Sequence, residues 1–188
     1  MRTVTNNVSN VVIKNSKFIC FVYNVSSIDE VNIYLNDIRN QYRDASHCCY
    51  AYVIDNVKKS SDDGEPGGTA GVPIMQVLES NNLNYVLCVV VRYFGGIKLG
   101  AGGLVRAYSK SVSQCLLDHI KELTYGFNVS IIFDYSLNKK VDYILRDIKI
   151  ISKDFNDTVS YTLNCTEDII NELKSIGVNV IVNNDLYY

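Results

Sequence analysis

The chain has 188 residues, of which 47% are hydrophobic and 20% charged, and its formal net charge is −2. This length allows one large domain or two small ones with a substantial core, and the balanced charge excludes a globally basic nucleic-acid-binding protein while leaving room for a local basic patch. The first residues lack the apolar core of a signal peptide and no run of about eighteen apolar residues occurs, so we expect a soluble, cytoplasmic protein without a membrane partner.

The chain begins with a predicted β-hairpin followed by a helix. Residues 8–14 and 17–25 are rich in Val, Ile and Phe and flank Asn15-Ser16, a pair typical of a turn. After Ser27, apolar residues recur at helical spacing as far as Ile38, and acidic residues occupy the first turn, where they suit the helix dipole. We expect this helix to pack on the core.

Residues 46–55 then predict a strand that carries a histidine and two cysteines. His47 is open to two interpretations, a general base or anion donor on one hand and a structural hydrogen-bonding residue on the other. The six cysteines show no CxxC spacing, and most have apolar neighbours, so we predict reduced, buried thiols: Cys20, Cys48, Cys49, Cys88, Cys115 and Cys165.

An acidic, glycine-rich segment at 61–71 follows this strand. The residue before Pro66 is restricted to extended conformations and the glycines permit turns, so we predict an ordered loop, with Pro73 at the first position of the next helix. Three carboxylates lie within four residues: Asp62, Asp63 and Glu65. They allow magnesium binding or acid-base chemistry, or alternatively a turn whose carboxylates pair with cations elsewhere. Their spacing matches neither an EF-hand nor a Walker loop.

The most unusual stretch is a predicted strand, glycine loop and helix. Residues 85–91 form a nearly uninterrupted apolar run, which indicates a central, covered strand, and an amphipathic helical pattern begins at Leu104. No acidic residue occurs between Glu79 and Asp118, where four cations lie: Arg92, Lys98, Arg106 and Lys110. Five glycines in nine positions permit positive φ and close approach of backbone amides to a ligand: Gly95, Gly96, Gly100, Gly102 and Gly103.

Charge gives this glycine loop two interpretations. Arg106 and Lys110 lie four residues apart on one helix face near the helix start, where they repel each other and oppose the helix dipole. A phosphate or carboxylate at the amides of residues 102–104 would satisfy both the helix terminus and the cations. The alternative is a tight turn whose cations point into water.

The sequence changes character after Leu123, and we place the domain boundary there, with a first domain at 1–123 and a second at 124–188. The second part predicts, in order, a strand near 127–133, a helix near 141–148, a hairpin of 150–155 with 158–165, a helix that Thr166 caps, and a strand at 178–182. This βαββαβ order is the split βαβ motif, which indicates an α+β protein. Residues 1–122 hold 12 Lys and Arg against 11 Asp and Glu, whereas residues 123–188 hold 6 Lys and Arg against 9 Asp and Glu. We therefore expect any basic face to lie in the first part of the chain.

Together the two loops resemble the signature of the IMPACT family and its YigZ-like bacterial branch. Residues 62–71 match Asp-Asp-Gly-Glu-Pro-x-Gly-Thr-Ala-Gly, and residues 92–108 match Arg-Tyr-Phe-Gly-Gly-x-Lys-Leu-Gly-x-Gly-Gly-Leu-x-Arg-Ala-Tyr. The resemblance extends to Ser16-Lys17-Phe18, to His47 and to the tail, which is similar to the family's small C-terminal domain. Gly67 departs from the pattern, since Ser or Ala is usual there.

This resemblance implies a fold and a cellular setting. It implies a first domain similar to the second domain of ribosomal protein S five and a ferredoxin-like C-terminal domain similar to one in elongation factor G. Both likenesses imply association with RNA or the ribosome. Eukaryotic members of the family are translation regulators that restrain a stress-responsive initiation kinase by competing for its activator, a pathway that bacteria lack. The family has no agreed reaction, and we predict no cofactor and no bound metal.

We therefore predict a non-catalytic regulator associated with translation that binds RNA or the ribosome at a cleft where the acidic and cationic segments meet. The predicted ligand-binding residues are Arg92, Tyr93, Gly95, Gly96, Lys98, Gly100, Gly102, Gly103, Arg106 and Lys110, with Phe94 and Tyr108 as further stacking candidates. One alternative is an enzyme acting on a small phosphorylated or carboxylated substrate with His47, Asp62, Asp63 or Glu65 in proton transfer or metal binding. Another is a module that binds a protein partner of the translation machinery.

Overall fold

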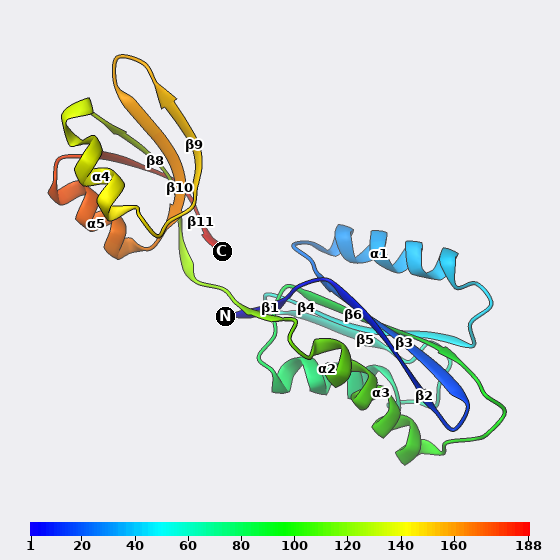
Figure 1. Ribbon diagram of the computed structural model, residues 1–188. Coiled ribbons are helices and arrows are strands. Elements are labelled where there is room, and N and C mark those ends of the chain that lie inside the picture. The colour runs from blue at the N-terminus through cyan, green and yellow to red at the C-terminus, as the bar shows by residue number, and fades with distance from the viewer. The chain divides into compact units, whose positions relative to one another are not determined.

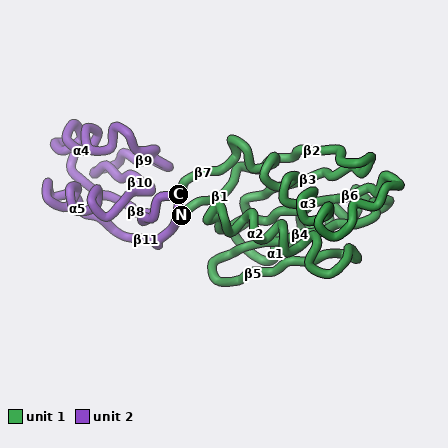
Figure 2. Tube along the Cα trace, turned by 90° about the horizontal axis from the view of Figure 1, so that it is seen from below, with its two compact units in different colours: residues 1–122 green, residues 123–188 purple.

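The computed structural model describes residues 1–188 and divides the chain into two compact units, Met1–Glu122 and Leu123–Tyr188, which Figure 2 shows in separate colours. Both units combine helices with antiparallel sheets, which confirms the predicted α+β class. No helix has the length and apolar character needed to span a membrane.

Unit 1 is built on a five-stranded antiparallel sheet in the order β2-β3-β6-β4-β5 (Figure 1). The strands are β2 (Asn7–Ile13), β3 (Ser16–Asn24), β4 (His47–Ile54), β5 (Val57–Ser61) and β6 (Val86–Tyr93). β6 lies at the centre, between β3 and β4, and every side chain from its start to Arg92 is buried. This confirms the central, covered strand that the apolar run predicts.

Helices cover both faces of this sheet (Figure 1). α1 (Ile28–Gln41) lies on one face, whereas α2 (Gly71–Ser80) and α3 (Ala101–Leu116) lie on the other. Because side chains alternate along a strand, β4 contributes Cys49 to the core under α2 and α3 and Tyr50 to the core under α1. A two-stranded ribbon of β1 (Arg2–Val4) with β7 (Ile120–Glu122) completes the unit.

The turns and caps of unit 1 follow the sequence signals with small shifts. The predicted hairpin of β2 with β3 is confirmed, but its turn is Lys14-Asn15, one residue earlier than expected, with φ angles of 45° and 65°. α1 begins just after Ser27 as predicted, and Ser27 caps it, since its side chain accepts a hydrogen bond from the Glu30 amide. α2 begins at Gly71, two residues before Pro73.

Unit 2 is a four-stranded antiparallel sheet in the order β11-β8-β10-β9, packed against two helices (Figure 1). Its elements are β8 (Tyr125–Phe133), the short 3-10 helix η1 (Tyr135–Leu137), α4 (Asn138–Ile144), β9 (Ile150–Phe155), β10 (Val159–Cys165), α5 (Glu167–Ser175) and β11 (Asn179–Tyr187). This succession confirms the predicted βαββαβ order. Thr166 precedes α5 without a side-chain capping bond, contrary to expectation. Gly177 adopts a φ of 89° just past the end of α5.

The six cysteines are all unpaired and buried, which confirms the prediction of buried thiols. Cys20, Cys88 and Cys115 lie in the core beneath α2 and α3, where the sulfur atoms of Cys20 and Cys88 are 3.6 Å apart. Burial raises the pKa of the Cys48 thiol and of the Cys165 thiol to about 11.

Candidate functional site

The carboxylates of the acidic loop between β5 and α2 accept hydrogen bonds from the protein's own backbone. Asp62 accepts from the amides of Gly68, Ala70 and Gly71 at 2.8–2.9 Å, which fixes the start of α2. Burial raises the pKa of Asp62, but these three hydrogen bonds outweigh it and lower the pKa overall. Asp63 accepts from the Cys48 amide at 2.6 Å and so ties the loop to β4.

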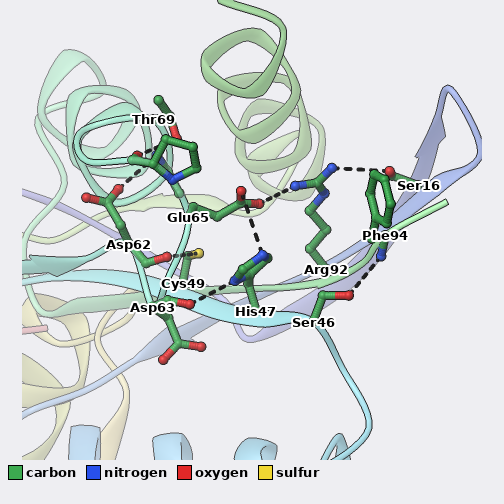
Figure 3. Close-up of polar contacts among 12 residues, drawn as sticks. Ser16, Ser46, His47, Cys49, Asp62, Asp63, Glu65, Thr69, Arg92 and Phe94 are labelled. Carbon is green, nitrogen blue, oxygen red and sulfur yellow. Dashed lines mark hydrogen bonds and ion pairs between the residues drawn. The ribbon is translucent and has the colours of Figure 1, made fainter. Parts of the chain in front are cut away.

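Glu65 points inward from the same loop and becomes the centre of a buried polar network (Figure 3). Its Oε1 accepts a hydrogen bond from Arg92 Nη1 at 2.5 Å and another from the Tyr108 hydroxyl at 2.8 Å. Burial and the neighbouring groups, Cys49 and Glu65 among them, raise the pKa of Tyr108, which therefore stays a neutral donor. A single carboxylate thus joins the acidic loop to β6 and α3.

His47 sits at the mouth of this network, with 23% of its side chain exposed. Its Nδ1 lies 2.9 Å from the carbonyl oxygen of Asp63, and because a carbonyl only accepts, Nδ1 carries a proton. Nε2 is then directed toward Glu65, 3.8 Å from Oε2 (Figure 3). The geometry gives His47 a structural hydrogen bond that orients its ring. No group of three or more His, Cys, Asp or Glu side chains is arranged to hold a metal ion.

Arg92 is buried, which differs from the expectation that it faces a ligand. It follows Cys88 and Val90 along β6, so strand alternation turns its side chain toward the face that α2 and α3 cover. Its side chain is 5% exposed, and its guanidinium pairs with Glu65 and lies over the rings of Phe18 and Phe94. We therefore remove Arg92 from the predicted set of ligand-binding residues.

The three aromatic residues predicted to stack on bases differ in their exposure and in the face of the sheet on which they lie. Tyr108 is fully buried against Phe18, and its role is in the core. Tyr93 alternates to the α1 face of the sheet, where its hydroxyl donates to Asp44 at 2.8 Å. Phe94 remains 49% exposed at the start of the glycine loop. Of the three aromatics, Phe94 alone stays available beside the loop.

The glycines of the loop have different structural roles. Gly95 donates its amide to Ser16 Oγ at 3.1 Å and lies so close to the β2–β3 turn that a Cβ atom here would meet the Asn15 carbonyl carbon at 2.1 Å. Gly96 and Gly100 adopt φ angles of 83° and 70°, which favour glycine. The loop is thus held against the hairpin turn that carries Lys14.

That contact brings together three cations from distant parts of the sequence. Lys14 from the hairpin turn and Arg106 and Lys110 from α3 line one pocket of about 250 Å³, which we call the cationic pocket. The remaining lining residues are Ile13, Leu99, Gly103 and Ala107, and no carboxylate lies within ion-pair distance of any of the three cations. Lys98 is exposed on the loop but does not line the pocket. Lys14 was missed by the sequence interpretation.

The first turn of α3 adjoins this pocket and adds to its positive potential. Gly100 occupies the N-cap position, where it provides no side-chain acceptor, and the first turn holds no acidic residue. The first hydrogen bond of the helix runs from the Leu104 amide to Gly100, so the preceding amides have no partner within the helix. The Arg106 guanidinium folds back over this turn, with Nη1 3.6 Å from where a Cβ of Gly102 would stand. Cations and free amides together favour an anion.

The acidic and glycine-rich segments converge, but not on an open cleft. They meet at the buried ion pair of Glu65 with Arg92, whereas the cationic pocket lies on the outer side of α3. Tyr108 and Arg106 are two residues apart and therefore project from opposite sides of the helix, one buried and one exposed. The expectation of one shared cleft is corrected to a buried network on one side of α3 and a cationic pocket on the other.

These features define a two-unit α+β protein whose first unit combines an internally bonded acidic loop with a cationic pocket at a glycine-rich helix start. Residues 14–116 match the model of the Impact N-terminal domain, and the chain belongs to the IMPACT family. It is 44% identical over 153 residues to the IMPACT family member YvyE of Bacillus subtilis, covering 78% of this chain and 69% of that protein.

One further relative belongs to the same family, and one solved structure shares the fold. The IMPACT family member YigZ of Escherichia coli is 40% identical over 109 residues, which are 55% of this chain and 53% of that protein. A solved crystal structure described as that of a hypothetical protein superposes with a TM-score of 0.63 at 27% identity, covering 96% of this chain and 95% of the other. The likeness to this structure extends over both units.

Proposed function

We propose that this protein is a non-catalytic, cytoplasmic regulator associated with translation, which binds the phosphate backbone of RNA, free or in the ribosome, through the cationic pocket. The observation that carries the proposal is the convergence of Lys14, Arg106 and Lys110 on one pocket that has no acidic lining residue. Three unpaired cations beside free helix-start amides repel one another, and a phosphate relieves that repulsion. The other residues that line the cationic pocket are apolar or glycine, so the three charged side chains are the groups that would bind a phosphate.

The glycine loop between β6 and α3 offers two further contacts to an RNA chain bound at the cationic pocket. Lys98 is exposed there and supplies a further phosphate contact, and Phe94 offers a ring for stacking on an unpaired base. The loop has no side chain at four of its glycines, so backbone amides can approach a phosphate closely: Gly96, Gly100, Gly102 and Gly103. Arg92 and Tyr108 are not part of this surface, because both are buried.

The proposed folds of the two units support this setting. We propose that unit 1 resembles the second domain of ribosomal protein S five. The sheet order β11-β8-β10-β9 with its βαββαβ succession supports a ferredoxin-like unit 2, similar to a domain of elongation factor G. Both likenesses favour a ligand in the translation machinery, although a fold alone does not define a function.

The test compares RNA binding by the Arg106→Ala variant with that of the wild type over a range of salt concentrations. Fluorescence anisotropy with a labelled single-stranded RNA, together with cosedimentation with ribosomal subunits, measures the affinity. We expect Arg106→Ala to weaken binding and to reduce the slope of log affinity against log salt by about 1, because one phosphate contact is lost. Circular dichroism verifies that the variant is folded.

A matched control is Lys59→Ala, which removes one exposed cation from β5 at the opposite edge of the sheet from β2. Loss of affinity in Arg106→Ala but not in Lys59→Ala supports the proposal. Equal effects of the two substitutions would mean that only net charge matters and would overturn it. Binding to ribosomes that survives nuclease treatment and is unchanged in Arg106→Ala would instead indicate a protein partner.

A further inference from the structure

Unit 2 has a groove that the proposed RNA interface does not use. It lies where α4 meets the residues that end α5, with a volume of about 450 Å³. Tyr143 and Ile144 of α4 and Ile176 at the end of α5 form its apolar surface, and Lys139 and Lys140 line its rim. We call this feature the α4–α5 groove.

Tyr143 is the main apolar element of the α4–α5 groove. It is 69% exposed, the highest value among the exposed large hydrophobic side chains of the chain, and it does not belong to the core of unit 2. The Arg146 guanidinium stands over its ring, 4.7 Å from the centroid, and donates to the Tyr143 carbonyl at 3.2 Å. The ring is therefore supported in an outward position. Tyr and Arg are both among the residue types enriched at the energetically dominant positions of protein interfaces.

The rim of the groove is positively charged although unit 2 as a whole is acidic. Lys139 and Lys140 have no carboxylate within ion-pair distance, and Arg146 pairs only with the highly exposed Asp147 at 3.3 Å, a contact of little strength in water. Asp142, the one acidic residue of α4, instead pairs with Lys153 at 3.9 Å and accepts from the Tyr161 hydroxyl. An apolar groove with a cationic rim therefore stands out against residues 123–188, which hold 6 basic and 9 acidic side chains.

We propose that the α4–α5 groove binds an acidic amphipathic segment of a partner protein. An apolar side chain of that segment packs between Tyr143 and Ile176, and its carboxylates pair with Lys139 and Lys140. The charge of the rim selects acidic partners, and the isoleucines favour an aliphatic side chain over a nucleic-acid base, since they present no hydrogen-bonding group to a base edge. The proposal is independent of RNA binding by unit 1.

The test uses the full-length protein and a fluorescein-labelled synthetic helical peptide with Leu along one face and Glu along the other. Two control peptides replace every Leu by Ser or every Glu by Lys. We expect the wild type to bind the first peptide at least about tenfold more tightly than either control, because both the apolar contact and the carboxylates are required.

Variants of the protein locate the binding site. We expect Tyr143→Ser to weaken peptide binding about tenfold through the lost apolar contact, and Lys139→Glu with Lys140→Glu to weaken it by a similar factor through charge reversal. Lys59→Glu with Lys121→Glu is the charge-matched control, because it reverses two exposed cations of unit 1. Arg106→Ala tests separation from the cationic pocket, and both variants should bind the peptide like the wild type. Every substituted side chain is exposed, so folding should persist, and thermal unfolding verifies it.

Three results would overturn the proposal. The first is equal affinity for the Leu-containing peptide and its Ser control, which would reduce the interaction to charge alone. The second is wild-type affinity in Tyr143→Ser and in the double lysine variant. The third is displacement of the peptide by single-stranded RNA even in the Arg106→Ala background, which would make the groove a nucleic-acid site.

Discussion

Glu65 Oε1 and Arg92 Nη1 lie 2.5 Å apart inside unit 1, with side chains that are 3% and 5% exposed. One residue comes from the acidic loop and the other from the strand that leads into the glycine loop. Tyr108 of α3 donates to the same carboxylate oxygen. The two sequence motifs are therefore parts of one structural network.

Removal of one member of this pair should destabilise unit 1 strongly. We expect Glu65→Ala or Arg92→Met alone to lower the free energy of unfolding by about 3–5 kcal/mol, because each leaves an unpaired charge in the core. The double variant should lose less than the sum of the single losses, with a coupling of about 1–3 kcal/mol. Urea denaturation followed by circular dichroism measures all four proteins. Strictly additive losses would show that the two side chains do not stabilise each other.

Asp62 should contribute a pH-dependent part of the stability. Replacement by Ala removes the acceptor for three backbone amides and should cost about 1–2 kcal/mol at neutral pH. Because the pKa of Asp62 is lowered from its ordinary value of 3.8 in the folded protein, this contribution is complete above that value and is lost as the pH falls through the lower folded pKa. The difference between wild type and variant in urea denaturation should therefore shrink in acid. A difference that stays constant down to about pH 3 would contradict this assignment.

Gly95 and Gly67 provide a matched pair of glycine substitutions. A Cβ on Gly95 would stand 2.1 Å from the Asn15 carbonyl carbon, so Gly95→Ala should displace the hairpin turn and cost roughly 2–4 kcal/mol. A Cβ on Gly67 meets nothing within 4 Å, and Gly67→Ala should change stability by less than about 1 kcal/mol. Thermal unfolding compares the two variants. Similar melting temperatures would refute the close packing of the loop on the turn.

Much of the fold could be predicted from local patterns. Alternation predicted β4, a nearly uninterrupted apolar run predicted β6, and helical spacing with acidic residues in the first turn predicted α1. β5 could not be predicted in this way, because four of its five residues are Lys or Ser and it pairs along a polar edge. The ribbon of β1 with β7 was also missed, since each strand has three residues and the partners are more than a hundred residues apart.

The site was harder to predict than the fold because its groups depend on long-range packing. Arg92 was grouped with the other cations of its stretch, although the period-two alternation of β6 already places it on the inner face with Val90. Lys14 joins the cationic pocket only because β3 pairs with β6 and Gly95 rests on the turn, and neither contact has a local sequence signal. Asp62 and Asp63 look like a ligand-binding cluster in the sequence, but in the structure their carboxylates accept hydrogen bonds from backbone amides of the protein itself.

The hydrogen bond from Tyr108 to Glu65 has a consequence for the outer surface of α3. It holds the buried face of the helix, so the position of Arg106 and Lys110 relative to the hairpin turn depends on a buried carboxylate that does not line the cationic pocket. Sequence variation at the acidic loop would therefore change the shape of that pocket indirectly, by shifting α3.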